Sequence, residues 1–318
     1  MTRKPASVRW RTNFLAIIRY ELLWNIRKKK FLGVLILAFV LATLTLALPP
    51  ILNNLNNLTT EPDPDYLTTT GVGLTGFGFF LFALVSVMNS ISGEFESGSI
   101  LPLLTKPISR TTIYLGKIFA AFLTILGAYV LLIIYMAAGG SIIYGPQNNL
   151  HLIFITLFGS IVSTLVWMGI VLAAGSVSKS SMLAALLGIG VWLGLNIAGG
   201  ILSVFSNQAG IMNYLPGSGA SGTLGTIISV NQTSITGGSI STGTDGIAEN
   251  LINYILHPAE NVTFFKTEIR GTGQIIRVPL YSEPLSLVVA RSIAVAVIYI
   301  FVFNLIAWYA LKRAQVAE

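Results

Sequence analysis

The chain has 318 residues, of which 53% are hydrophobic and only 10% are charged, and its mean hydropathy is +0.77. Soluble domains carry about 25% charged residues, so these values exclude a soluble globular protein and predict a polytopic membrane protein. The absence of cysteine excludes disulfides, thiolate metal sites and cysteine nucleophiles. The two histidines argue against a histidine metal cluster, and the net charge of +7 is explained by its distribution along the chain rather than by nucleic-acid binding.

The N-terminal segment, residues 1–30, is predicted to be cytoplasmic and to contain an amphipathic helix on the membrane surface. Trp10, Phe14 and Ile17 recur at helical spacing, and the segment ends in four basic residues, 27–30. It is too long and too amphipathic for a cleavable signal peptide. Glu21 falls on the apolar side, where a buried carboxylate would need a partner. The alternative is an exposed helix with a solvated Glu21.

Six apolar runs are each long enough to cross a bilayer, which takes about 20 helical residues. The expected fold is therefore all-α, with six transmembrane helices. The predicted spans are residues 31–50, 73–92, 116–138, 152–175, 182–205 and 286–310. Gly190 and Gly194 form a small-xxx-small pair that permits close helix packing.

The distribution of basic residues along the chain predicts its orientation in the membrane. Of the 19 Lys and Arg residues, 15 lie in the segments before the first span, after the last span and in the loops at 93–117 and 176–181, whereas three lie on the opposite side with eight acidic residues. The positive-inside rule places both termini in the cytoplasm of a multi-pass protein of the cytoplasmic membrane. Residues 206–285 are then outside. The remaining basic residue, Arg291, is predicted to be an interfacial anchor, with a substrate or gating role as the alternative.

The loop from Gly93 to Lys117 has the local signals of a short amphipathic helix between two spans. Ser99 can cap this helix, and Pro102 is tolerable in its first turn. Pro107 stops the helix, and Ser109 can cap the span that follows.

This loop resembles the one between spans two and three of type-2 ABC exporter permeases, whose pattern is roughly Glu-x-x-x-Gly-Thr-Leu, then Pro-[Ile/Val]-Ser-Arg and Gly-Lys. Ser99 and Pro102 depart from that pattern. The resemblance implies an N-terminal elbow helix with Glu21 in its middle and a coupling helix that contacts an ATPase. The coupling residues it implies are Glu94, Glu96, Gly98, Ser99, Ile100, Leu103, Leu104, Pro107, Arg110 and Lys117. It further implies a second permease copy and two ABC ATPase subunits that bind ATP and Mg²⁺, and no cofactor in this chain.

The insertion at 206–285 is predicted to be a small mixed domain. Residues 217–246 are rich in Gly, Ser and Thr and are predicted to be flexible or loosely β. A short amphipathic helix is expected at 247–256 on the outer membrane face, and a hairpin at 263–280. Three sequons, Asn57, Asn231 and Asn261, are candidate glycosylation sites in segments assigned outside. The predicted regions are thus 1–30, 31–205 with the loop 93–117, 206–285 and 286–318.

The sequence predicts no enzyme. It contains no P-loop, nucleophile elbow or HExxH motif, so no catalytic or metal residue is assigned and ATP hydrolysis is expected in a partner. A secondary transporter or channel remains the alternative to an ABC permease, although ion-coupled carriers generally need charged residues at mid-depth. Aromatic residues in the spans favour an amphiphilic, lipid-linked or uncharged cargo over a small ion, unless they serve packing alone: Phe77, Phe79, Phe80, Phe82, Trp167 and Trp192. Membrane lipid is an expected partner, and nucleic acid is not.

Overall fold

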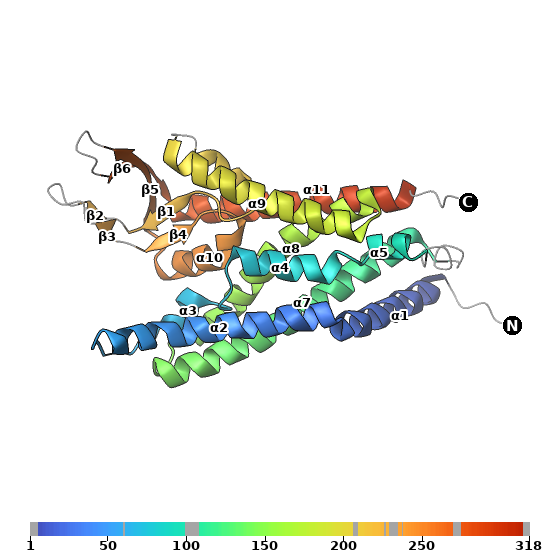
Figure 1. Ribbon diagram of the computed structural model, residues 1–318, viewed down its shortest axis with the longest axis horizontal. Coiled ribbons are helices and arrows are strands. Elements are labelled where there is room, and N and C mark those ends of the chain that lie inside the picture. Colours follow the sequence, from blue (N-terminus) through green and yellow to red (C-terminus); the bar gives the residue numbers. More distant parts are fainter. Residues whose placement is uncertain are drawn as a thin grey trace.

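The computed structural model describes residues 6–59, 61–98, 108–205, 209–225, 227–228, 235–236, 238–269 and 275–313. Within these residues, six helices are long and apolar enough to cross a membrane, which confirms the predicted fold class. They are Lys29–Leu55, Gly76–Glu96, Arg110–Ile143, Leu150–Ser178, Ser181–Leu202 and Leu285–Arg313. Figure 1 shows both termini and α5 at one end of the molecule and the strands at the opposite end.

Helix α1 (Ala6–Arg27) precedes α2 (Lys29–Leu55), and the two are separated by the extended backbone of Lys28, with φ −64° and ψ 119°. Helix α1 packs along α7 (Arg110–Ile143). This close contact requires Gly116, because a Cβ there would lie 2.6 Å from Cγ2 of Ile17. The placement of α1 on the membrane surface stays a prediction.

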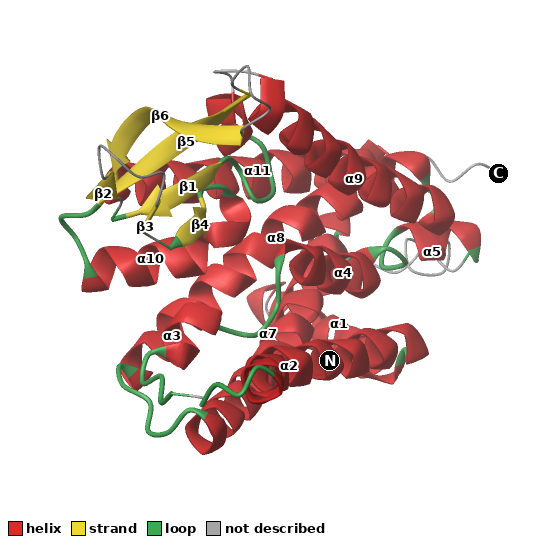
Figure 2. Cartoon of the chain, turned by 60° about the vertical axis from the view of Figure 1, so that its left-hand side comes forward, coloured by secondary structure: helices red, strands yellow, loops and turns green. Residues whose placement is uncertain are grey.

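The second span is built in two pieces, α4 (Gly76–Val87) and α5 (Ser92–Glu96), after the short helix α3 (Tyr66–Thr70). Helix α8 (Ile153–Ser178) follows η1 (Leu150–Leu152) and is followed by α9 (Ser181–Phe205), and α11 (Leu285–Arg313) is the last span. Figure 2 shows α8 in the middle of the bundle, where it contacts α4, α9, α10 and α11.

Aromatic side chains fill the core around α8. Trp167 is fully buried and meets Phe80 edge-on, with ring centroids 5.5 Å apart. Phe80 also stacks on Trp192 of α9 at 5.6 Å, and Phe82 packs against Tyr129 at 5.3 Å. These rings therefore serve packing in the chain described here. Such offset and edge-on pairs add to the stabilisation from burial alone.

The region between α9 and α11 combines helices with an antiparallel sheet. The 3-10 turns η2 (Ala209–Tyr214) and η3 (Thr244–Gly246) flank β1 (Ser221–Leu224), β2 (Ile227–Ile228), β3 (Ile235–Thr236) and β4 (Ser239–Ser241). Strands β5 (Asn261–Ile269) and β6 (Ile275–Pro284) form the predicted hairpin. The larger sheet has the order β4-β1-β5-β6, and β2 pairs with β3.

The glycine-rich segment 217–246 is predicted to be flexible or loosely β. Strands β1 and β4 lie within it, which agrees with the second alternative for the described residues. Buried hydrogen bonds to Asn213 hold the residues beside these strands, because its Oδ1 accepts from the backbone N–H of Ala220 at 2.9 Å and from the Thr242 hydroxyl at 2.6 Å. Ile240 of β4 also packs into the buried cluster of this region. The bond between Asn213 and Thr242 joins residues 29 positions apart and leaves no local sequence pattern.

Helix α10 (Ile247–Leu256) has the predicted boundaries, but it is not a free surface helix. Ile247 and Asn250 are fully buried, and α10 packs against α8 and α11. A Cβ on Gly159 of α8 would lie 2.5 Å from Cα of Ala248, so this glycine permits the close approach.

Arg291 does not reach an open surface as an interfacial anchor would. Its Nη1 lies 2.8 Å from Oε2 of Glu283, and its side chain is only 10% exposed. The guanidinium also lies over the ring of Tyr214, 5.7 Å from the centroid. Glu283 is the penultimate residue of β6, two positions before α11 begins, so this ion pair joins the sheet to the last span.

Candidate functional site: a charge network at the end that carries the termini

The loop between spans two and three is held at both ends by local structure. Gly98 follows α5 with a φ of +68°, a conformation that favours glycine. Ser109 caps α7 as predicted, because its hydroxyl accepts from the backbone N–H of Thr112 at 3.1 Å. The predicted coupling residues between these points lie outside the described residues: Ser99, Ile100, Leu103, Leu104 and Pro107.

Lys117 is the centre of a buried ion-pair network. Its Nζ lies 2.5 Å from Oε1 of Glu21 on α1 and 2.7 Å from Oε1 of Glu94 on α5. The side chains of Lys117 and Glu21 are 4% and 8% exposed. The predicted partner for Glu21 is therefore Lys117, and one ammonium group joins three helices.

The glycine before Lys117 makes this network geometrically feasible. Ile17 and Glu21 are four residues apart and lie on the same face of α1. Gly116 allows that face to approach α7, and the next residue, Lys117, then reaches Glu21. Gly116 therefore permits the close approach of α1 and α7, and Lys117 supplies the positive charge that pairs with Glu21.

Lys28 adds positive charge near the network. Its Nζ donates to Oδ1 of Asn25 at 2.8 Å. Burial lowers the pKa of Lys28, while the nearby Glu21 carboxylate acts in the opposite direction. Lys28 therefore partly balances the second carboxylate, which a single Lys117 cannot neutralise.

Glu96 ties α5 to the turn between α8 and α9. Its Oε1 accepts from the backbone N–H of Ser181 at 2.8 Å and from the Ser180 hydroxyl at 2.9 Å. Its other oxygen accepts from the Ser181 hydroxyl. A carboxylate at the start of a helix satisfies free N–H groups and interacts favourably with the helix dipole. Nearby, Lys179 lies over the Phe95 ring at 5.6 Å.

Arg110 ties α7 to the end of α11. Its Nη1 donates to the carbonyl of Lys312 at 2.6 Å, where the last turn of α11 has free carbonyl groups. Beside it, Nε1 of Trp308 donates to the hydroxyl of Thr111 at 3.1 Å. A cation at a helix C-terminus is electrostatically favourable.

The charged residues flanking the loop therefore bind elements of their own chain. Lys117 reaches Glu21 on α1 and Glu94 on α5, Glu96 reaches α9, and Arg110 reaches α11. The sequence motif marked these residues, but their partners lie 23 to 202 positions away and leave no local signal. We call this set the loop anchor: Glu21, Glu94, Glu96, Arg110 and Lys117.

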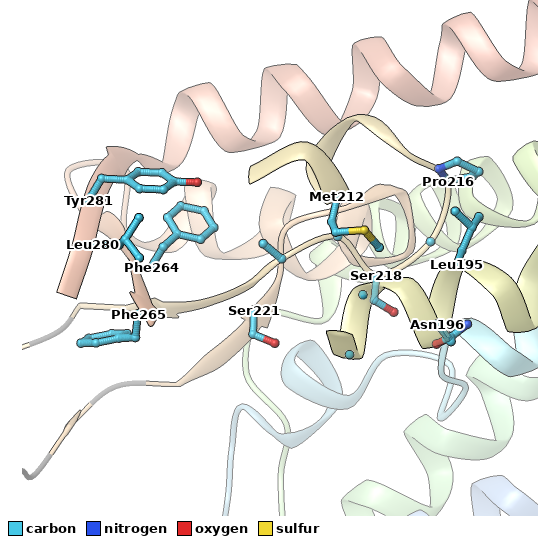
Figure 3. Close-up of a pocket in the computed structure, with 15 residues that line it drawn as sticks. Leu195, Asn196, Met212, Pro216, Ser218, Ser221, Phe264, Phe265, Leu280 and Tyr281 are labelled. Atoms are coloured by element: carbon cyan, nitrogen blue, oxygen red, sulfur yellow. The ribbon is translucent and has the colours of Figure 1, made fainter. Parts of the chain in front are cut away.

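A cavity at the opposite end of the molecule, about 270 Å³ in volume, lies between α9 and the sheet. Figure 3 shows Phe264, Phe265 and Tyr281 on its strand side and Asn196 on α9. The glycine-rich segment 216–221 forms another wall. Among the described residues no charged side chain lines it, so this cavity offers a small ion no counter-charge.

The candidate glycosylation sites stay predictions. Asn57 and Asn261 are exposed, and Asn231 lies outside the described residues. Within the described ranges, no group of three or more His, Cys, Asp or Glu residues is arranged to hold a metal ion.

Six apolar helices with a small sheet at the end opposite the termini define a multi-pass membrane protein. The family model described as ABC-2 family transporter protein matches residues 15–316. The chain belongs to this family, and it is therefore a permease component of an ABC transporter, a class that works with an ABC ATPase. A search of curated proteins found no match.

Proposed function

We propose that this chain is the permease subunit of an ABC exporter and that a separately encoded ATPase subunit binds Mg²⁺ and ATP and drives it. The observation that carries the proposal is the loop anchor. It links the 93–117 loop, which the family resemblance assigns to ATPase contact, to α1, α9 and α11. Both termini and this loop are proposed to be cytoplasmic, with residues 206–285 outside.

The anchor offers a physical route for coupling. Closure of an ATPase around nucleotide would displace residues 98–108, and a displaced segment transmits force only through rigid contacts. Lys117 is buried and Glu94 is partly buried within such contacts, and Arg110 fixes the first turn of α7 to α11. A movement of the loop would therefore shift several spans together rather than deform the loop alone.

The alternative function, a secondary transporter, is less well supported than an ABC permease. Ion-coupled carriers place coupling charges near mid-depth. In the described spans, the charged residues lie near the helix ends: Lys29, Lys30, Glu94, Glu96, Arg110, Lys117, Arg291, Lys312 and Arg313.

We further propose that two copies pair through α9. This span is the least buried, since 6% of its most apolar window is buried compared with 72% for Leu150–Ser178. Gly190 and Gly194 both face open space, so a second helix can approach them closely. Cysteine at Gly194 should form a disulfide-linked dimer in the membrane under oxidation, whereas cysteine at Gly127 on α7 should not. Equal crosslinking at both positions would count against this interface.

Co-expression with an ABC ATPase from the same gene neighbourhood tests the function. We expect a stable complex that hydrolyses ATP, while the purified chain alone hydrolyses none. Robust nucleotide hydrolysis by the isolated chain would overturn the proposal.

A further inference from the structure

A second cavity, about 280 Å³ in volume, lies among α3, the first turn of α4, α8, η3 and α10. It is at the end of the molecule opposite the loop anchor. Its lining includes hydroxyl side chains such as Thr75, Thr156 and Ser160, and it contains two carboxylates, Asp245 and Glu249. We call it the Asp245–Glu249 cavity.

Asp245 is held at the start of α4. Its Oδ1 accepts from Nε1 of the buried Trp167 at 3.2 Å. Its Oδ2 occupies the space where a side chain on Gly76 would begin, so a larger residue at this first position of α4 would displace the Asp245 carboxylate. Glu249 lies in the first turn of α10 and lines the same cavity.

Neither carboxylate has a cationic partner in the described part of the chain. No Lys, Arg or His residue lines the cavity, and no described ion pair includes Asp245 or Glu249. Burial raises the pKa of Asp245 to about 6 and that of Glu249 to about 7. Near neutral pH, the cavity therefore holds negative charge that its own side chains do not balance, an unfavourable arrangement without a bound cation.

The wall of the cavity also has unused hydrogen-bonding capacity. Ser160 is 1% exposed and lines the cavity. Its hydroxyl makes no hydrogen bond within the described residues, whereas the hydroxyls of Ser163 and Thr164 on the same helix are bonded. Buried hydroxyls usually have a partner, so Ser160 points to a polar group that this chain does not supply.

We propose that the Asp245–Glu249 cavity binds an ammonium group. An alkylammonium carries three N–H donors, which suits carboxylate and hydroxyl oxygens spread over a cavity wall. The volume accommodates a small organic cation, and the described residues provide no third acidic or histidine ligand for a metal. The apolar lining residues Phe79 and Ile252 can contact its carbon atoms. The proposal does not depend on the ATPase or on the direction of transport.

Ethanolamine is the probe, and ethylene glycol, in which a hydroxyl replaces the ammonium, is its uncharged control. The full chain in phosphatidylglycerol nanodiscs at pH 8 is titrated with each compound while its Tm is recorded. We expect a saturable rise in Tm with ethanolamine only. Glu249→Gln and Asp245→Asn should weaken the apparent Kd at least about tenfold, as expected for loss of one partner of a charged pair. Glu260→Gln, a solvent-accessible acid of the same region, should leave it unchanged.

Nanodiscs that contain phosphatidylethanolamine distinguish the source of the ammonium group. Loss of the ethanolamine response there identifies a lipid headgroup as the ligand, and an unchanged response identifies a soluble amine. The absence of a saturable response in the wild-type chain would overturn the proposal. An equal response to ethylene glycol would also overturn it. Binding of Mg²⁺ or Ca²⁺ that Glu249→Gln abolishes, with no effect of ethanolamine, would overturn it as well. Glu249→Gln preserves side-chain shape, so the test does not depend on Asp245→Asn folding.

Discussion

Single charged side chains hold this membrane protein together at both ends. Lys117 pairs with two carboxylates, and Arg291 pairs with Glu283, each with little access to solvent. At such positions, removing one partner destabilises the fold by more than the intact ion pair stabilises it, because the remaining charge stays buried without a partner. Each residue therefore specifies a contact between elements more than it adds net stability.

Replacing Lys117 tests this directly. Lys117→Met keeps the length of the side chain but leaves Glu21 and Glu94 unpaired, and we expect a loss of about 3–5 kcal/mol in stability. Thermal unfolding in detergent, followed by tryptophan fluorescence, measures it. Lys312→Met, at an exposed position, is the control. Adding Glu21→Gln and Glu94→Gln to Lys117→Met should recover much of the loss. A wild-type Tm for the single variant would show that the pairs are not buried as described.

Glu249 gives the stability a specific pH dependence. Its folded pKa of about 7 lies above the ordinary value of 4.5, so the folded chain binds more protons than the unfolded chain between those values. Stability should therefore fall as pH rises from about 4.5 to 7 and become constant above that range, and Asp245 contributes in the same direction.

Tm measured in steps from pH 5 to pH 8 checks this dependence. Glu249→Gln should flatten the fall and raise the Tm at pH 8, whereas Glu260→Gln should not. An unchanged slope in Glu249→Gln would remove Glu249 as its cause.

At the scale of elements, the apolar runs predicted each span because hydrophobic length is a local property. The amphipathic pattern at 247–256 and the alternation at 263–280 likewise predicted α10 and the β5–β6 hairpin. Strands β1 and β4 were not predicted as an ordered sheet, because their Gly, Ser and Thr residues show little hydrophobic alternation. The sequence also could not predict the partners of Glu96 and Arg110, because these contacts depend on how helices distant in the sequence pack together.

The contact between α1 and α7 should be sensitive to one added methyl group. Gly116→Ala would place Cβ against Ile17, and overpacking of this kind costs about 1–3 kcal/mol. Gly127→Ala on the same helix has open space and should be neutral or stabilising. The Tm of both variants gives the comparison. Combining Gly116→Ala with Ile17→Ala should show positive coupling in a double-mutant cycle. Equal effects of the two glycine changes would indicate that the helices do not approach closely here.

For the whole molecule, both termini and the loop anchor share one end, and the sheet lies at the other. The basic residues concentrate at the first end and the acidic residues at the second. This agrees with a single orientation across the membrane, and the chain is suited to a labelling test because it has no native cysteine.

Cysteine at Asn57 should react with an impermeant reagent in intact cells, and cysteine at Lys312 should react only after lysis. Both positions are exposed, so accessibility within the protein does not limit either reaction. The reverse labelling pattern would invert the proposed topology.

We propose that the loop anchor couples an ATPase to the spans. The most direct measurement is the ATPase rate of the assembled complex in nanodiscs, together with the amount of ATPase subunit that copurifies. We expect Glu96→Ala and Arg110→Ala to leave a folded permease in the membrane but to weaken assembly or lower the rate, because α5 and α7 lose their links to α9 and α11. Arg110→Lys, which retains the charge, should recover part of the effect. Wild-type assembly and wild-type rates in both alanine variants would contradict the coupling role.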